Sequence, residues 1–421
     1  MSAEDEQRSG ISRRRLIAGA GAAGVGIGLG GAGYLIGRDG AEAETHLDDT
    51  VPFFGARQAG IETPAQDRLH FAAFDLTVSS PDELRDLLRE WTDAAAEMTR
   101  GRMVGDVNDE QLAPPDDTGE TVGLQPASLT VTFGFGPDLF ERDGRDRFGL
   151  RSRRPHALRL LPPLPGDTLD PGLSGGDLCV QACSDDPQVA FHAVRNLARL
   201  GRGAVVMRWS QLGFGRTSST TRSQATPRNL MGFKDGTRNL RAEDTEDMNR
   251  FVWLGPGDDV PWMANGTYMV TRRIRMLIEI WDRSALSDQE TTIGRHKYSG
   301  APLGGAREFD DPDLGARRQS EPVIPADAHI RLAAPQMNDG ESILRRGYSF
   351  TDGVVEELGE LDAGLFFICF QRDPDKQFTA IQRRLGRIDA LNEYIRHTSS
   401  AVFAVPPGAQ PGGFVGEGLF A

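Results

Sequence analysis

The chain has 421 residues, which exceeds the usual size of one globular domain and suffices for two domains that each bury a core. A composition of 38% apolar and 26% charged residues excludes a chain that is membrane-embedded or disordered throughout. The net charge of -14 argues against nucleic acid as a partner, because a duplex needs a basic face to neutralise its phosphates. Three cysteines without a CxxC pair argue against a disulfide framework and a structural zinc site.

Residues 1–43 are predicted to be an export signal. The sequence SRRR at 12–15 precedes an uncharged, glycine-rich run over 16–37, and AEA at 41–43 follows as a small-x-small cleavage sequence. Twin arginines before a weakly apolar core are typical of the twin-arginine pathway, which exports folded proteins. The alternative is a transmembrane anchor, since the run is just long enough to span a bilayer. We expect export to the periplasm, the cell envelope or the medium.

The first half of the remaining chain predicts strands and helices in the order β-α-β-β-α-β. Alternating or β-forming residues predict the strands, and apolar residues at helical spacing predict the helices. In the first helix, Leu84, Leu88 and Trp91 share one face. The predicted strands are 69–78, 128–136, 177–184 and 204–211, and the predicted helices are 81–100 and 186–200.

The second half of the chain can be interpreted in the same order. Its predicted elements are a strand and then a helix over 267–281, short strands at 347–351 and 365–371, a helix at 374–385 and a strand at 401–406. Two ferredoxin-like units of an α+β fold are the simplest summary, with domains at 44–225 and 226–421. Three Gly/Pro/Asp-rich loops interrupt the pattern, at 101–127, 162–176 and 301–327. Loops of that length are usually functional walls or flexible segments.

His329 differs in context from the other six histidines, which we expect to be core or surface residues. It lies in the largely apolar segment 324–335, which prolines bound at both ends. An imidazole in such a dry wall is what the axial position of a haem requires. A hydrogen-bonded core histidine is the alternative.

A second candidate is the sequence GFKDGTRN at 232–239. Gly232 and Gly236 flank Asp235, so the backbone can approach a ligand closely while a carboxylate stands at the loop tip. A plain turn is the alternative. The loop is not a phosphate loop, because no GxxxxGK[ST] sequence is present.

GFKDGTRN resembles the GxxDG signature of the dye-decolorizing peroxidases, a haem family with two ferredoxin-like units per chain. Other segments resemble the family in the same order, at 129–140, 175–197, 293–305, 327–336 and 343–350. With its twin-arginine signal, the chain is most similar to the exported branch that is also described as deferrochelatase/peroxidase. The resemblance implies a dimeric α/β barrel-like fold and one haem b per chain.

The resemblance also implies roles for individual residues. His329 corresponds to the proximal ligand of the haem iron, and Asp235 corresponds to the distal acid-base residue. Arg345 corresponds to the distal arginine that stabilises charge as the O–O bond breaks. Arg346 is the alternative, although the preceding Ile-Leu favours Arg345.

Further residues are expected around the cofactor. Glu393 is the predicted acceptor for the second ring nitrogen of the proximal histidine. Arg295 and Arg331 are predicted partners of the haem propionates on grounds of charge. Gly232 and Gly236 are expected to let the distal loop approach the haem.

The implied reaction is reduction of hydrogen peroxide, coupled to oxidation of dyes, phenols or other one-electron donors. An aspartate is a weaker base than histidine, so we expect an acidic activity optimum. The second hypothesis is a haem-binding protein of iron acquisition, with iron-uptake partners and incidental peroxidase turnover. A ferredoxin-like binding module without haem is a third. A homo-oligomer is a family expectation.

Overall fold

A computed structural model of the chain describes residues 49–105 and 111–421. The export signal predicted for residues 1–43 therefore lies outside the described residues. Within the described ranges, no helix combines the length and the apolar character needed to cross a membrane.

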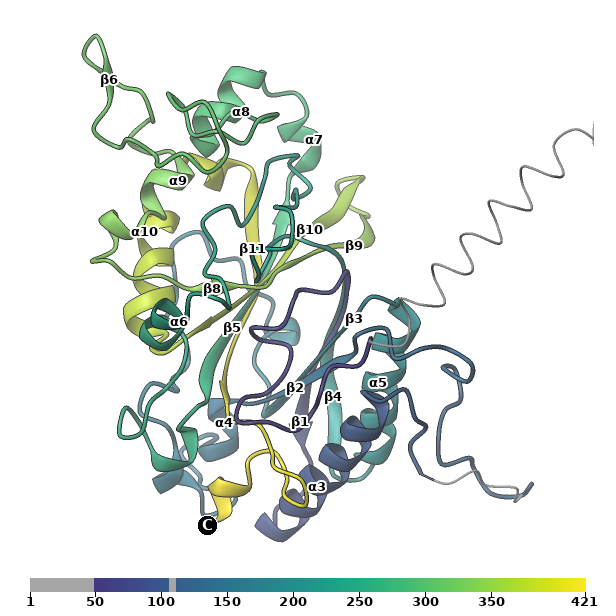
Figure 1. Cartoon of the computed structure of the whole chain (residues 1–421). Coiled ribbons are helices and arrows are strands. Elements are labelled where there is room, and N and C mark those ends of the chain that lie inside the picture. Colours follow the sequence, from purple (N-terminus) through teal and green to yellow (C-terminus); the bar gives the residue numbers. More distant parts are fainter. Residues whose placement is uncertain (1–48, 106–110) are drawn as a thin grey trace, which may run out of the picture. The chain divides into compact units, whose positions relative to one another are not determined.

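Eight strands of the described chain close into an antiparallel barrel (Figure 1). The order around the barrel is β5-β11-β2-β3-β1-β4-β9-β10, and β10 closes it by pairing with β5 as well as with β9. A ninth, two-residue strand pairs with the far end of β10. The strands are β1 (Arg68–Leu76), β2 (Thr130–Phe135), β3 (Leu178–Ser184), β4 (Val205–Arg216), β5 (Thr267–Met276), β8 (Leu344–Arg345), β9 (Tyr348–Val355), β10 (Glu360–Gln371) and β11 (Ile395–Val405).

The first half has the predicted order β1-α3-β2-β3-α5-β4. Helix α3 (Pro81–Met98) begins at a capping box in which the Ser80 and Glu83 side chains each accept a backbone N–H. Its apolar face, which includes Trp91, is buried. Helix α5 (Pro187–Leu200) lies beside α3 and packs on β1 and β3 (Figure 1).

The second half also has the predicted order, and its last helix is α10 (Ala380–Ile388). The helix expected after β5 is a single turn, α7 (Ile278–Trp281), and a second helix, α8 (Leu286–Ile293), follows it. Helix α8 escaped prediction because its sequence LSDQETTI lacks an apolar stripe. The remaining short elements are α4 (Pro137–Phe140), α6 (Thr245–Phe251), α9 (His329–Leu332), β6 (Arg317–Arg318) and β7 (Glu321–Pro322).

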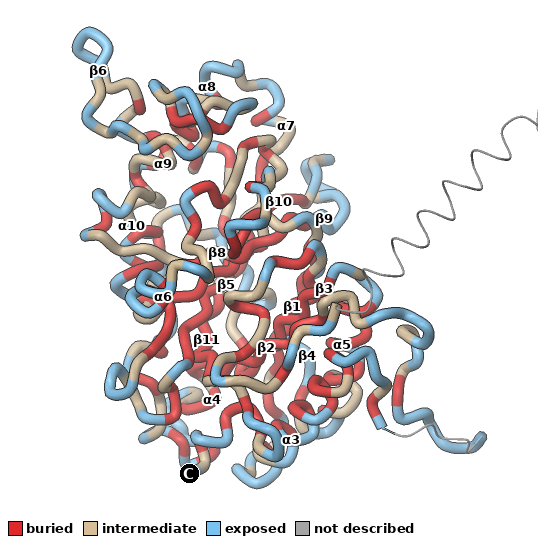
Figure 2. Tube along the Cα trace, in the orientation of Figure 1, coloured by how far each residue is buried: buried red, intermediate tan, exposed pale blue. Residues whose placement is uncertain are grey.

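Six of the barrel strands are buried along most of their length, whereas β4 and β9 are more exposed (Figure 2). One buried cluster is aromatic: the ring centroid of Phe71 lies 5.2 Å from Trp209, 5.4 Å from Phe366 and 6.1 Å from Phe403. Such ring contacts add to the free energy that burial itself contributes. The three cysteines, Cys179, Cys183 and Cys369, are buried and free, which agrees with the expected lack of a disulfide framework.

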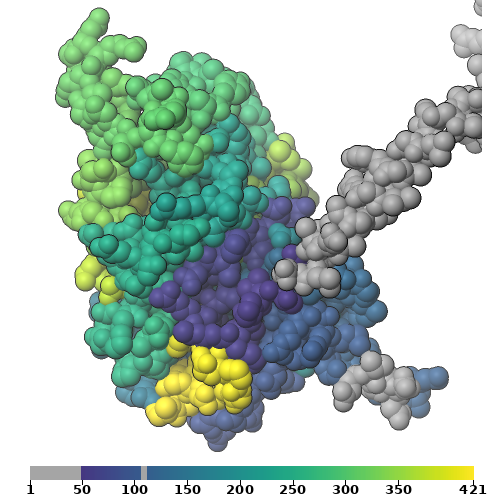
Figure 3. Space-filling model, in the orientation of Figure 1, coloured from purple at the N-terminus to yellow at the C-terminus, as the bar shows by residue number. Residues whose placement is uncertain are grey.

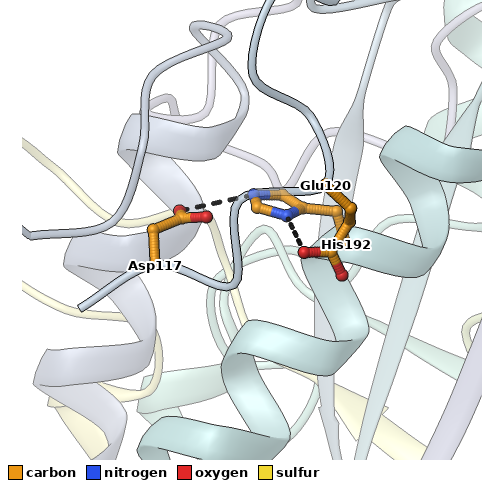
Figure 4. A group of neighbouring side chains, drawn as sticks. All are labelled: Asp117, Glu120 and His192. Carbon is orange, nitrogen blue, oxygen red and sulfur yellow. Dashed lines mark ion pairs between the residues drawn. The ribbon is translucent and has the colours of Figure 1, made fainter. Parts of the chain in front are cut away.

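The first long loop is tied to α5 by a buried histidine (Figure 4). His192 lies between two loop carboxylates, with its Nε2 atom 3.5 Å from Asp117 and its Nδ1 atom 3.3 Å from Glu120. Asp117 also accepts the backbone N–H groups of Val104 and Gly119 at 2.8 and 2.6 Å. The two ring nitrogens face different carboxylates, so the group serves to hold the loop against the helix.

The third long loop carries the β6–β7 hairpin and extends from the surface at one end of the folded unit (Figure 3). It leads directly into α9, whose first residue is His329. Helix α9 contacts α8 and α10. The fold therefore places the histidine in a group of short helices at one end of the barrel.

Candidate active site

The GFKDG loop has the backbone that its glycines predict. Gly232 and Gly236 have φ angles of 82° and 84°, in the left-handed region that favours glycine. A Cβ atom at position 236 would lie only 3.0 Å from the Cα atom of Ser218. The N–H group of Asp235 donates to the Pro227 carbonyl at 3.0 Å. The turn thus fixes the position of Asp235 relative to the segments that contain Ser218 and Pro227.

Asp235 and Arg345 form a direct ion pair. The Nη1 atom of Arg345 lies 2.7 Å from Oδ1 of Asp235, and both side chains are partly exposed, by 27% for Arg345 and 15% for Asp235. The carboxamide of Asn229 donates to the other carboxylate oxygen, Oδ2, at 3.2 Å. Both oxygens therefore have donors, and the carboxylate orientation is determined by two separate segments of the chain.

The neighbouring Arg346 turns the other way and is fully buried. Its guanidinium donates to the carbonyls of Thr63 and Pro64 at 2.6 and 3.3 Å, and also to the side chain of Gln66. These partners directly precede β1. Arg346 therefore anchors the start of the barrel, and Arg345 is the arginine that faces Asp235.

His329 is held by a buried carboxylate. Its Nδ1 atom lies 2.6 Å from Oδ2 of Asp389, and no hydrogen bond to its Nε2 atom forms within the described residues. Burial alone would lower the pKa of His329, but the Asp389 carboxylate and then that of Asp235 raise it above its usual value. The positive charge of Arg345 acts in the opposite direction. The ion pair and the imidazole thus share one electrostatic environment.

Glu393 is not the partner of His329, which corrects the sequence prediction. Glu393 is exposed, whereas the side chain of Asp389 is 3% exposed. Asp389 precedes a 3₁₀ turn, Ala390–Glu393, and its Oδ1 atom accepts the N–H of Leu391 at 2.9 Å. This cap turns the aspartate inward and leaves the glutamate on the outer side.

The two arginines predicted for the propionates already donate to backbone carbonyls. Arg331 donates through Nη2 to Leu314 and Ile324, both at 2.8 Å, and so ties down the long loop before it. Arg295 is 4% exposed and donates through Nη1 to the carbonyl of Glu308 at 2.9 Å. Burial, followed by the positive charge of nearby arginines, lowers the pKa of Arg295 to about 10. Their propionate contacts stay predictions.

Sequence reasoning missed several residues that hold the site. Glu308 forms an ion pair with Lys234 and accepts the hydroxyl of Thr237 at 3.2 Å, so it clamps both sides of Asp235. Asn229 was also missed, although asparagine before a glycine turn commonly bonds to its own loop. No local signal identifies Glu308, because it lies 74 residues beyond Lys234.

The residues present fit a haem with a histidine ligand. An imidazole with one nitrogen bonded to a carboxylate and the other nitrogen free is the usual arrangement of a metal-binding histidine. A buried acid and an arginine within electrostatic reach suit the open face of a peroxidase haem. His329 is the residue that could bind the iron, through Nε2.

Comparison with known proteins gives the family. Residues 58–215 match the family described as Dyp-type peroxidase, N-terminal, and residues 226–410 match Dyp-type peroxidase, C-terminal. The chain belongs to the Dyp-type peroxidase family. It is therefore an enzyme of a haem peroxidase family, as the sequence predicted.

Relatives match over nearly the whole chain. A dye-decolorizing peroxidase from Thermobifida fusca (strain YX) is 40% identical and covers 100% of this chain and 99% of its own length. A deferrochelatase from Escherichia coli O6:K15:H31 is 36% identical over 97% of both chains. The solved structure of ferric DtpA from Streptomyces lividans is 42% identical with a TM-score of 0.80, covering 88% of this chain and 97% of that one. The predicted α+β, barrel-like fold is confirmed.

Proposed function

We propose that the protein is a haem-dependent peroxidase that reduces hydrogen peroxide and oxidises dyes, phenols or other one-electron donors. The Asp235–Arg345 ion pair is the observation that supports this proposal, together with the carboxylate-bonded imidazole of His329. All three residues lie in 226–421, the segment we propose as the haem-carrying domain.

His329 would hold one haem b through Nε2, and Asp389 would keep the imidazole oriented and electron-rich. When bound, the haem would give two electrons to peroxide and would regain them one at a time from a reducing substrate. Gly232 and Gly236 let the distal loop keep its position, because an added Cβ atom would lie 2.9 Å from the Lys297 side chain or 3.0 Å from Ser218. Arg295 and Arg331 are the proposed neighbours of the propionates.

Asp235 moves the proton. Among the described residues, only Asn229 donates to its Oδ2 atom, at 3.2 Å, so this oxygen would take a proton from peroxide and return it to the oxygen that leaves as water. Arg345 keeps Oδ1 occupied and offers a positive charge where negative charge develops as the O–O bond breaks. Arg345 is fixed before the reaction begins, which avoids reorganisation.

The test is the absorption spectrum of the haem-loaded protein before and after one equivalent of hydrogen peroxide, followed in a stopped-flow instrument. We expect a rapid loss of the Soret band that is slowed at least a hundredfold in Asp235→Asn and in Arg345→Leu. A Soret band that does not respond to peroxide would contradict the peroxidase.

A second candidate function is haem handling in iron acquisition, which the relative named deferrochelatase favours. A carrier has no need of an acid and an arginine that face each other. Incubation with haem under reducing conditions separates the two functions. Accumulation of metal-free porphyrin would show removal of iron from an intact ring, whereas a peroxidase leaves the haem intact.

We further propose export by the twin-arginine machinery and assembly into a homo-oligomer. Arg13→Lys with Arg14→Lys should keep the protein in the cytoplasm, as measured by cell fractionation. Sedimentation velocity of the haem-loaded protein measures the oligomeric state directly.

A further inference from the structure

We propose that Asn239 is a positioning residue that sets Arg345 against Asp235. This inference rests on the proposed function, because it assumes that the ion pair serves the reaction with peroxide. Asn239 belongs to the same loop as Asp235, four residues later, and its side chain is turned away from the carboxylate toward the backbone of Arg345.

The Asn239 carboxamide forms hydrogen bonds with both backbone groups of Arg345. Its Oδ1 atom accepts the Arg345 N–H at 2.8 Å, and its Nδ2 atom donates to the Arg345 carbonyl at 2.8 Å. The same Nδ2 atom donates to the carbonyl of Ser219 at 3.0 Å. Asn239 is 8% exposed, so these three bonds form out of contact with bulk water.

These bonds take the place of those that a second neighbouring strand would make with β8. Arg345 lies in the two-residue strand β8, which pairs with β10 through Leu344 opposite Phe370 and Arg345 opposite Cys369. In an extended strand, the N–H and C=O groups of one residue point to the same edge. Those of Arg345 meet Asn239, whose carboxamide offers one acceptor and one donor as a peptide group does.

The bonds of Asn239 couple the backbone of the Asp235 loop to the backbone of Arg345. The N–H of Asn239 donates to the carbonyl of Gly236 at 3.0 Å, which closes a turn directly after Asp235. The five-residue segment 235–239 therefore carries both the acid and the side chain that binds the backbone of its partner. A shift of the loop moves Asp235 and Arg345 together, so the 2.7 Å contact is preserved.

The test is a double-mutant cycle of Asn239→Ala and Arg345→Leu in the haem-loaded protein. We expect Asn239→Ala alone to slow the reaction with hydrogen peroxide at least tenfold. In the Arg345→Leu background we expect the same substitution to change the rate less than twofold, because Asn239 acts through Arg345. Equal effects in both backgrounds would overturn the proposal, as would an unchanged rate in Asn239→Ala.

Gln58 supplies a matched control. Its side chain accepts the N–H of Phe133 at 2.8 Å and donates to the carbonyls of Phe133 and Pro406 at 3.1 and 3.0 Å, so Gln58→Ala loses the same kinds of bond, two to β2 and one to the residue after β11. We expect Gln58→Ala to lower stability and leave the peroxide rate within twofold of wild type. A tenfold loss of rate in this control would mean that general loosening explains both variants.

Amide hydrogen exchange gives a readout that does not depend on turnover. We expect exchange over 343–350 to accelerate at least tenfold in Asn239→Ala, and to a smaller extent in Asn239→Asp, which keeps the acceptor but loses both donors. Unchanged exchange in both variants would overturn the proposal. If instead Arg345→Leu reacts with peroxide as fast as wild type, the proposed role of the ion pair fails and the positioning inference falls with it.

Discussion

Oδ2 of Asp389 lies 2.6 Å from Nδ1 of His329, and the side chain of Asp389 is 3% exposed. A carboxylate with so little water around it makes a strong, charge-assisted bond to the ring. The imidazole is therefore fixed in one orientation with Nε2 pointing away from the aspartate. In the proposed function this is the residue pair that sets the properties of the iron ligand.

We expect Asp389→Asn to weaken haem binding by 10- to 100-fold, because the second partner of a metal-binding histidine orients the ring and raises its basicity. Titration of the haem-free protein, followed at the Soret band, measures this affinity. Glu393→Gln serves as the control and should bind haem as wild type does, since Glu393 is exposed. A loss of affinity in the control alone would restore the original assignment of Glu393.

The two adjacent arginines should give opposite phenotypes. Arg345→Leu should slow the reaction with peroxide while changing the free energy of unfolding by less than about 1 kcal/mol, because its side chain is 27% exposed. Arg346→Met should lower that free energy by about 3 kcal/mol, because buried acceptors lose a charged donor. Urea unfolding and stopped-flow rates, measured on both variants, separate these effects. A larger loss of unfolding free energy in Arg345→Leu than in Arg346→Met would contradict the roles given to the two arginines.

Gly236→Ala tests the loop geometry. The substitution forces a residue with a side chain to a φ of 84° and brings its Cβ atom within 3.0 Å of Ser218, so we expect a loss of about 2 kcal/mol and a slower reaction with peroxide. Gly257→Ala is the control, because Gly257 has a φ of 87° but nothing within 4 Å of the added Cβ atom. It should lose only about 1 kcal/mol, with an unchanged rate. Equal losses would mean that the contact with Ser218 has no influence.

Two buried histidines predict that the fold weakens in acid. Burial, and for His397 also the charge of Arg272, lowers the pKa of His397 to about 3, and burial lowers that of His70 to about 4. Unfolded histidine titrates near 6.5. Below that pH the unfolded chain binds protons that the fold does not accept, so stability falls as the pH decreases from about 6.5 to about 3.

We therefore expect His397→Gln to flatten the pH dependence of the free energy of unfolding by about 1 kcal/mol per pH unit between pH 4 and 6. Urea unfolding at a series of pH values measures the slope. The same slope in wild type and variant would show that His397 is protonated within the fold. If the fold weakens in acid as expected, an acidic activity optimum would place catalysis in the pH range in which the fold is less stable.

The order of the elements could be predicted because each is specified locally. Apolar residues such as Leu84, Leu88 and Trp91 follow a helical spacing, and the glycines around Asp235 indicate a turn independently of the rest of the fold. The closed barrel was expected only from the resemblance to a family, because no residue of β5 or β10 signals its distant partner in the sequence itself.

The site residues divide in the same way. Asp235 and Arg345 followed from a resemblance in sequence, but the choice between Asp389 and Glu393 depends on which side of a 3₁₀ turn faces the helix that carries His329. Both are carboxylates at a plausible distance along the chain. Only the packing of that turn distinguishes them.

The anchor of Arg346 has a consequence for maturation. The carbonyls that hold it belong to Thr63 and Pro64, which lie beyond the predicted cleavage sequence at 41–43. A protease that removes the leader there leaves the anchor whole. A cut that also removes Thr63 and Pro64 would free Arg346, and with it the strand that presents Arg345. The segment between leader and barrel thus sets the limit to which the amino terminus can be trimmed without harm to chemistry at the other end of the chain.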